Sequence, residues 1–182
     1  MTASSAPIDA DAAGPIIERA MAGDEVAFAR IVAAHNEDMA RISYLVSGSL
    51  DVAEDAVQAA WAIAWRRLST LRDPARLRPW LMSVAANEAR QMTRGNRRRS
   101  IRELAVSLTD VGSPATADRA ALIDLANALA TLDPKDRTLI GLRYIADLDS
   151  ETIGRELGLS ASGVRVRLHR LHARLRKELG DD

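Results

Sequence analysis

The sequence predicts an all-α protein that consists of two small helical domains joined by a flexible linker. Alanine, leucine and arginine, which favour helices, are abundant, and aromatic residues make up only 3% of the chain. Apolar residues recur at spacings of three and four along most of its length, which is the period of a helix with one buried face. Residues 100–118 lack this period and mix glycine, proline and small polar residues, as linkers do.

The first domain is predicted over residues 14–96, after a disordered tail over residues 1–13 that is small and polar. A short helix ends near Gly23. The next helix begins at Glu25 and ends at Gly48, because glycine tolerates the left-handed conformation that terminates helices. Its apolar positions follow the helical period and are expected to face the core: Phe28, Ile31, Val32, His35, Met39, Ile42 and Leu45.

Two further helices of the first domain have recognisable starts. Asp51 lies three residues before Glu54, a capping-box arrangement in which each residue satisfies a free backbone N–H group. Asp73 and Pro74 provide an N-cap and a first helical residue for the following helix, which we expect to be kinked or restarted at Pro79. The apolar face of the third helix is predicted from its spacing to contain Val52, Ala56, Ala59 and Ile63.

The second domain is predicted over residues 119–180, after a linker over residues 97–118. Four leucines share one face of its first helix: Leu122, Leu125, Leu129 and Leu132. An Asp-Pro pair starts the next helix. Two more helices are separated by a three-residue turn that begins with Gly158 and ends with Ser160, a sound N-cap. A helix, a short turn containing glycine and a second helix form the helix-turn-helix signature.

Charge is distributed unevenly, although 25 acidic and 25 basic residues balance in the whole chain. Residues 1–60 carry ten acids and three bases, whereas residues 61–109 carry eleven bases and three acids. In the last third the bases gather in residues 160–177, which hold six arginines and lysines, two histidines and no acid. This asymmetry predicts an acidic surface early in the chain and basic surfaces later, with different partners.

The segment 160–177 is an amphipathic basic helix by its spacing. An apolar stripe runs along one side and basic residues lie opposite; the stripe consists of Val164, Leu168, Leu171, Leu175 and Leu179. Such a helix can pack its leucines on the preceding helices and present arginines to the major groove of DNA. The alternative is an ordinary solvated helix, and the preceding turn favours DNA binding.

The helix that contains Glu54, Asp55 and Gln58 carries these acid and amide groups together in its first turns. They fit two alternatives: acids that favour the helix dipole, or a face that docks on a basic protein surface. General acid–base catalysis by Glu54 and Asp55 is disfavoured, because adjacent residues point about 100° apart on a helix.

The segment from Trp80 to Arg99 passes from aromatic through apolar to strongly basic residues. Trp80 is expected in the core, with a base-stacking platform as the alternative. Asn87 has the side chain to read a base. The arginines form a candidate phosphate track: Arg90, Arg94, Arg97, Arg98 and Arg99.

Other function classes find no support in the sequence. There is no cysteine, which excludes disulfides and thiolate metal sites, and His169 and His172 lack further ligands nearby. No phosphate-binding loop or nucleophile motif occurs, so we expect neither a cofactor nor catalytic residues. No apolar run approaches the ~20 residues that span a bilayer, and the N-terminus lacks a signal pattern, so a cytoplasmic protein is expected.

Segments from residue 14 to residue 179 resemble, in order and spacing, the bacterial sigma-70-type extracytoplasmic-function (ECF, group 4) sigma factors of RNA polymerase. The segments are GDEVAFARIVAAH, DVAEDAVQAAWAIAW, LRPWLMSVAANEARQMTR and LATLDPKDRTLIGLRYIADLDSETIGRELGLSASGVRVRLHRLHARLRK. No single segment is decisive, but the combination is specific to this family.

The resemblance implies that the first domain is sigma region 2, which binds core RNA polymerase and captures a flipped base of the −10 promoter element. The second domain is implied to be region 4, which reads the −35 duplex. The implied partners are core polymerase, through its beta-prime clamp helices and beta flap, promoter DNA and an anti-sigma factor.

The family's functional positions are carried over residue by residue. The implied contacts with core polymerase are Asp51, Glu54, Asp55 and Gln58. The implied −10 DNA contacts are Arg76, Arg78, Trp80, Asn87, Arg90, Arg94, Arg97 and Arg98. The implied −35 DNA contacts are Ser160, Ser162, Arg165, Arg167, Arg170 and Arg174.

The sequence departs from the family pattern at several positions. Gly163 stands where the family usually has threonine, Leu171 and His172 replace an Ala-Arg pair, and Ala59 replaces an acid. The main rival function is a dimeric helix-turn-helix regulator that binds operators and never contacts core polymerase. It explains residues 119–180 equally well, but it leaves the acid-and-amide helix unexplained. A helical adaptor for acidic proteins is a second rival.

Overall fold

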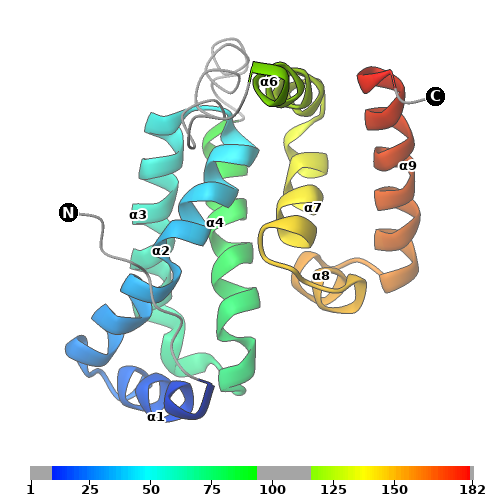
Figure 1. Ribbon diagram of the computed structural model, residues 1–182. Coiled ribbons are helices and arrows are strands. Elements are labelled where there is room, and N and C mark those ends of the chain that lie inside the picture. The colour runs from blue at the N-terminus through cyan, green and yellow to red at the C-terminus, as the bar shows by residue number, and fades with distance from the viewer. Residues whose placement is uncertain (1–9, 94–115, 181–182) are drawn as a thin grey trace.

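The computed structural model describes residues 10–93 and 116–180, and these residues form helices and connecting turns without a strand (Figure 1). The predicted all-α class is therefore confirmed. The segment predicted as the linker lies largely outside the described residues, and so do residues 1–9 of the predicted tail. Residues 10–13, which were assigned to that tail, are instead the first turn of a helix, so the tail prediction is too long there.

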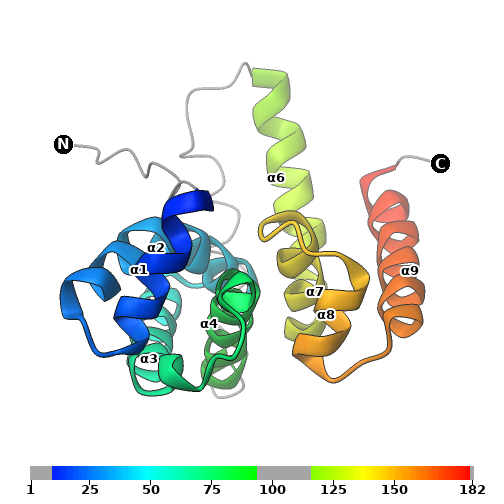
Figure 2. The same cartoon turned by 90° about the horizontal axis from the view of Figure 1, so that it is seen from below.

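The first half of the molecule is a bundle around the long helix α2. Helix α2 packs against α1, α3 and α4, and α3 also packs against α4 (Figures 1 and 2). The elements are α1 (Ala10–Met21), α2 (Glu25–Ser47), α3 (Leu50–Arg67), the 3-10 turns η1 (Leu68–Thr70) and η2 (Pro74–Arg76), and α4 (Leu77–Thr93). Pro79 lies in the first turn of α4, so the helix restarts at Leu77, two residues before the predicted position.

The boundaries of these helices follow from local chemistry. The Asp24 carboxylate accepts a hydrogen bond from the Ala27 N–H at 3.0 Å, and Gly48 ends α2 in the left-handed conformation with φ 72°. Asp73 accepts from the Ala75 N–H, as its predicted capping role requires. The predicted capping box at Asp51 is wrong: α3 begins at Leu50, because the chain already turns at Ser47 and Ser49, and Asp51 lies within the first turn.

Residues 116–180 of the described structure form four helices, the second half of the molecule, and the last two form the predicted helix-turn-helix. The elements are α6 (Thr116–Ala130), α7 (Pro134–Tyr144), α8 (Ser150–Leu157) and α9 (Ala161–Leu179). Gly158 ends α8 with φ 68°, a conformation that favours glycine. Gly154 is required for another reason: a Cβ atom at this position would lie 2.6 Å from the Leu159 carbonyl oxygen, so the turn is tight enough to exclude any side chain.

The two halves pack directly against each other through an apolar interface. Helix α7 lies against α2 and α4, and α8 lies against α4. At Gly141 of α7 a Cβ atom would meet the Leu45 side chain at 3.3 Å, so the absence of a side chain lets the helices approach closely. Arg137 is buried in this interface and donates a hydrogen bond from Nε to the Val46 carbonyl at 3.1 Å. The second half is therefore docked on the first by both apolar and polar contacts.

Candidate nucleic-acid interface

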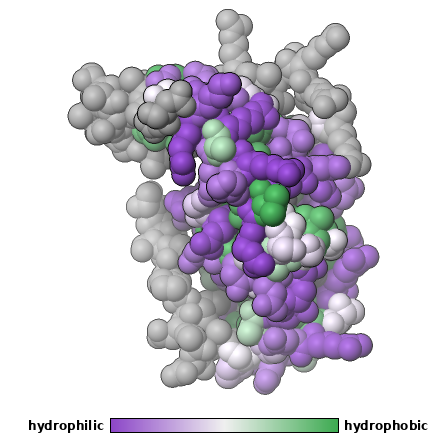
Figure 3. Space-filling view, turned by 90° about the vertical axis from the view of Figure 1, so that its right-hand side faces the viewer, coloured by the Kyte–Doolittle hydropathy of each residue, from purple (hydrophilic) through white to green (hydrophobic). Residues whose placement is uncertain are grey.

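Helix α9 lies at one side of the molecule, with α7 and α8 between it and α4 (Figures 1 and 2). It packs against α6, α7 and α8 and buries Val164, Leu168 and Leu171 of the predicted apolar stripe. Leu175 is half-buried and packs against the core, whereas Leu179, the last residue of the stripe, is exposed. Seen from the side of α9, the surface is largely hydrophilic with small hydrophobic patches (Figure 3). The helix therefore presents a polar face to solvent along most of its length.

The N-terminus of α9 is held by Ser160, as predicted. Its Oγ atom accepts a hydrogen bond from the Gly163 N–H at 3.0 Å and lies 3.2 Å from the Ser162 hydroxyl. Both serines are exposed. The backbone N–H groups of the first turn carry the positive end of the helix dipole, which favours a phosphate group at this position.

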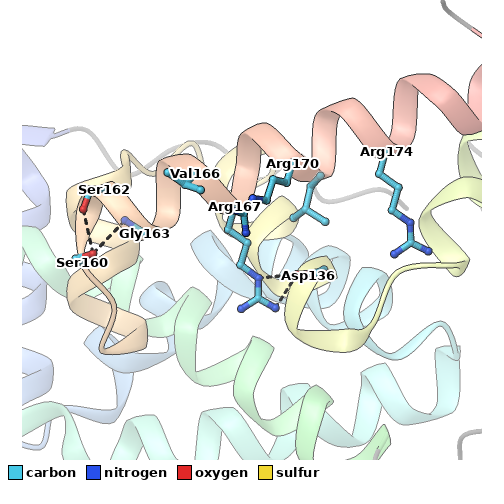
Figure 4. Close-up of a pocket in the computed structure, with 9 residues that line it drawn as sticks. Asp136, Ser160, Ser162, Gly163, Val166, Arg167, Arg170 and Arg174 are labelled. Atoms are coloured by element: carbon cyan, nitrogen blue, oxygen red, sulfur yellow. Dashed lines mark hydrogen bonds and ion pairs between the residues drawn. The ribbon is translucent and has the colours of Figure 1, made fainter.

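The arginines predicted to face the −35 duplex divide into two pairs. Arg165 and Arg170 are exposed and form no hydrogen bond or ion pair with any residue that the structure describes. Arg167 instead binds the Asp136 carboxylate of α7 through both Nε and a terminal nitrogen, each at 2.7 Å (Figure 4). Arg174 pairs with Glu178 at 3.2 Å and donates to the Thr131 carbonyl. Only the first pair is free for a ligand in this conformation.

Three of these arginines, Arg167, Arg170 and Arg174, line a shallow depression between the N-terminal half of α9 and the start of α7 (Figure 4). Its lining joins cations and hydroxyls to one exposed apolar residue, with a single acid that Arg167 neutralises. The lining residues are Asp136, Ser160, Ser162, Gly163, Val166, Arg167, Arg170, Leu171 and Arg174. An open, basic depression at the N-terminus of a helix suits a polyanion.

The acid-and-amide face of α3 is a second candidate interface. All four predicted polymerase contacts are exposed, and none has a hydrogen-bond or ion-pair partner among the described residues: Asp51, Glu54, Asp55 and Gln58. The opposite side of α3 is buried through Ala53, Ala56, Val57, Ala60 and Ala64. The helix therefore presents unneutralised negative charge outward while its small residues pack on the bundle.

Two arginines predicted to bind −10 DNA contact the second half of the molecule instead. Arg76 forms an ion pair with Glu156 of α8 at 2.7 Å. Arg78 pairs with Asp38 of α2 at 2.9 Å and donates hydrogen bonds to the carbonyl groups of Ala146 and Ile145, which follow α7. In this conformation both guanidinium groups take part in docking the two halves.

A smaller depression lies where η1, η2 and the start of α4 meet α8. It is lined by Arg67, Thr70, Leu71, Arg72, Asp73, Arg76, Trp80 and Glu156. Trp80 is half-buried and packs against the core, so it is neither a fully buried core residue nor a fully exposed platform for base stacking. Glu156 comes from the second half, and therefore the acid stands beside the basic turn that was predicted to contact DNA.

The remaining predicted −10 residues lie on or after α4. The Asn87 side-chain oxygen accepts a hydrogen bond from Arg90 at 2.8 Å, and both residues are half-buried. Arg94, Arg97 and Arg98 lie outside the described residues. The structure thus brings Asn87 and Arg90 together, one turn apart on α4.

His35, on the predicted apolar face of α2, is half-buried. Burial lowers the pKa of its imidazole and Arg78 lowers that pKa further, whereas Asp38 opposes the shift. At the other end of the molecule the Tyr144 hydroxyl and His172 Nε2 lie 2.5 Å apart. Within the described part of the chain no group of three or more histidines, cysteines and acids could hold a metal, and no helix is long and apolar enough to cross a membrane.

Sequence reasoning missed the acids that hold the arginines. Asp136, Glu156 and Asp38 lie 31, 80 and 40 residues from the arginines that they bind. No local pattern marks such pairs, because each depends on how separate helices pack. The Arg174–Glu178 pair is the exception, since a spacing of four residues on a helix is a readable signal.

Comparison with known proteins gives a consistent result for both halves. The model of the family "Sigma-70 region 2" matches residues 31–99, and that of "Sigma-70, region 4" matches residues 122–175. The chain is 33% identical over 129 residues to the RNA polymerase sigma-E factor of Streptomyces coelicolor, covering 70% of this chain and 71% of that protein. It is 32% identical over 171 residues to the "Probable RNA polymerase sigma factor RfaY" of Xanthomonas campestris, covering 90% of this chain but 43% of that protein.

A solved structure has the same arrangement of helices. The structure of CnrH in complex with the cytosolic domain of CnrY aligns with a TM-score of 0.69 and 27% identity, over 92% of this chain and 97% of that one. The similarity therefore extends across both halves.

Proposed function

The chain belongs to the sigma-70 family of bacterial RNA polymerase sigma factors, in the ECF group, and we propose how its two halves share the work of transcription initiation. A sigma factor directs core RNA polymerase to promoters. The chemistry of transcription belongs to the polymerase, so the residues of this chain act by binding and positioning. We assign polymerase binding and −10 DNA to the half that contains α1 to α4, and −35 DNA to the half that contains α6 to α9.

The acid-and-amide face of α3 binds core polymerase in this proposal, at the clamp helices of the beta-prime subunit. Its support is the exposure of Asp51, Glu54, Asp55 and Gln58 without partners among the described residues. Charges left unpaired on a fold that pairs many of its other surface charges are available to a basic partner. A further contact between the second half and the beta flap follows from the family resemblance.

The −35 element is read by the N-terminal half of α9. Arg165 and Arg170 are the principal cations, because they are exposed and unpaired among the described residues. Arginine binds the O6 and N7 atoms of guanine or a backbone phosphate. Arg167 and Arg174, predicted as equal contributors, hold α9 on its own domain in this conformation, and each contacts DNA only if its ion pair is shared or broken.

The −10 element is captured near the turn that precedes α4, with Trp80, Asn87 and Arg90 as supporting residues. Arg76 and Arg78 become available only when Glu156 and the Ala146 carbonyl move away, because both arginines are engaged by the second half. We therefore propose that the two halves separate before −10 DNA binds. Arg94, Arg97 and Arg98 remain expected DNA contacts on the strength of the sequence alone.

An anti-sigma factor is a further expected partner. CnrH, which this chain resembles over 92% of its length, was solved in complex with the cytosolic domain of CnrY. A partner that stabilises the docked arrangement of the two halves would also keep Arg76 and Arg78 away from DNA.

The observation that carries this proposal is the presence, in one chain, of a free acidic face on α3 and a basic helix-turn-helix. The test is transcription in vitro with purified core polymerase, the full chain and a pool of promoter fragments. We expect the chain to bind core polymerase and to start transcription at a subset of fragments. Failure to bind core polymerase would overturn the proposal and favour the operator-binding regulator. No feature of the described residues favours that regulator over a sigma factor.

A further inference from the structure

Val166 is an exposed apolar residue at the centre of the solvent-facing side of α9. Half of its surface, 50%, is accessible. It lies two residues after the buried Val164, and so about 200° around the helix from it. The exposed half of this β-branched apolar side chain makes no contact with the core of the domain. It is therefore available to a ligand.

The residues next to Val166 on the helix surface are polar or, at Gly163, have no side chain. Ser162 and Arg170 lie four residues before and after it, on the same side of the helix. Gly163, one turn earlier, has no side chain, and a Cβ atom there would already lie 3.0 Å from the Ser160 Oγ atom. The isopropyl group therefore borders the basic depression and has open space toward the helix N-terminus (Figure 4).

A protein-docking patch is a poor explanation for this residue. A protein interface needs a contiguous apolar area, whereas Val166 is a single apolar residue among serine, glycine and arginine. A major groove offers a better match, because thymine presents its C5-methyl group there beside the hydrogen-bonding edges of other bases. An isolated methyl-sized apolar contact within a polar surface is what such a base requires.

We propose that Val166 is a specificity-determining residue that selects thymine in the duplex through its C5-methyl group, while Arg170 selects a nearby guanine. The proposal rests on the proposed reading of the −35 duplex by α9. The two side chains are about 6 Å apart along the helix axis, and duplex DNA rises about 3.4 Å per base pair. The thymine and the guanine therefore lie within about two base pairs of each other.

The test uses the free full chain and a library of random DNA duplexes, from which the tightest binders are selected. Each thymine of the selected duplex is then replaced in turn by uracil, which removes only the methyl group. We expect one replacement to weaken binding by the wild-type chain about fourfold, the contribution of one buried methyl group. The same replacement should leave binding by Val166→Ser unchanged. Val26→Ser, at another exposed valine on α2, is the matched control and should keep the wild-type response.

Three outcomes would overturn the proposal: no duplex is enriched, every thymine tolerates uracil, or wild type and Val166→Ser lose the same amount at the same thymine. Core polymerase binding by the same preparations separates this result from the wider function. A chain that binds core polymerase but shows no methyl dependence is a sigma factor that reads the duplex in another way. If the chain shows the methyl dependence but does not bind core polymerase, the proposal for Val166 stands and the proposed sigma-factor function fails.

Discussion

Helices α3 and α9 both present charged faces to solvent, but only on α9 do some of these charged side chains also form ion pairs within the protein. The acids and the glutamine on α3 are free of partners among the described residues. On α9, Arg167 and Arg174 are held by Asp136, Glu178 and Thr131, whereas Arg165 and Arg170 are free. Exposure and charge therefore do not identify a binding residue by themselves. A charged group without an internal partner is the better candidate.

The difference follows from what lies next to each helix. The outer face of α3 borders solvent, since its small residues pack inward on α2 and α4. Helix α9 contacts α7, and Asp136 in the first turn of α7 binds Arg167 of α9. An acid there is favoured by the dipole of α7 and is also within reach of α9. Arg167 and Arg174 are therefore neutralised by their own domain, and Arg165 and Arg170 are left for DNA.

Reversing charge on α3 should have the largest effect. Asp55→Arg places a cation on a face that we propose binds a basic surface, and we expect core polymerase binding to weaken by about 100-fold. Folding should be unaffected, because Asp55 has no partner to lose among the described residues. Binding is measured by titrating labelled core polymerase, and the melting temperature is measured alongside. Glu18→Arg, at an exposed acid of α1, is the control; equal weakening by both variants would show that only net charge matters.

Removing a free arginine from α9 should have the next largest effect. Arg170→Ala is expected to weaken binding to the selected −35 duplex about 10- to 100-fold, the range for one guanine contact, with an unchanged melting temperature. Arg176→Ala removes an exposed arginine near the end of the same helix and serves as the control. The duplex affinity is measured by fluorescence anisotropy at one fixed salt concentration, because phosphate contacts depend on salt. If Arg176→Ala loses as much as Arg170→Ala, the site is a diffuse basic surface and not a reader.

Much of the fold, but less of the site, was predictable from sequence. Asp73 and Ser160 were found as caps because their hydrogen bonds reach only two or three residues along the chain. The helix-turn-helix was found because Gly158 and Ser160 mark it locally. By contrast, the docking of the two halves depends on Arg76, Arg78 and Arg137, whose partners in the other half are at least 67 residues away along the chain. Nothing local in the sequence shows that these arginines bind the other half of the chain, and Arg76 and Arg78 were themselves expected to meet DNA.

The apolar faces of the helices were predicted with mixed success, for a physical reason. On α2 the spacing was informative, and Ile31, Met39 and Ile42 are fully buried. On α3 the predicted face included Val52 and Ile63, which are half-buried, whereas the structure buries Ala53, Val57, Ala60 and Ala64. Alanine is small enough to lie on either side of a helix, so an alanine-rich helix has no clear apolar stripe. The exposed Leu125 of α6 is a similar error.

Breaking the ion pair between Arg167 of α9 and Asp136 of α7 should lower the stability of the fold modestly. Arg167→Ala removes a two-nitrogen contact with Asp136, whose side chain is 15% exposed against 38% for the arginine. Because solvent screens such a pair, we expect a loss of about 1 kcal/mol, or a melting temperature lower by about 2–4 °C. Asp136→Ala should cost a similar amount. The double variant should then be no less stable than the worse single variant, since the two residues share one interaction.

Arg165→Ala is the matched control for that cycle. It removes an arginine two residues away on the same helix that has no partner among the described residues, and its melting temperature should equal that of the wild type. Additive losses in the double variant would mean that Arg167 and Asp136 act independently, and the distinction between held and free arginines would then fail.

The smallest expected effect concerns the caps that position these helices. The Asp149 carboxylate accepts a hydrogen bond from the Thr152 N–H at 2.7 Å at the start of α8. This bond and the Thr152 hydroxyl lower the pKa of Asp149 from its ordinary value of 3.8. The stabilising effect is therefore complete above pH 3.8 and is lost as the pH falls through the lower pKa of the folded state.

Asp149→Asn keeps an oxygen acceptor but does not titrate in this range. We expect it to melt about 1–3 °C below the wild type at pH 7, with the difference shrinking below pH 3.8. Asp51→Asn on α3 removes the same charge from an exposed carboxylate that caps nothing, so it should melt close to the wild type at pH 7. A constant difference for Asp149→Asn from pH 7 to pH 3 would mean that the cap depends on hydrogen-bond geometry alone and not on the charge of the carboxylate.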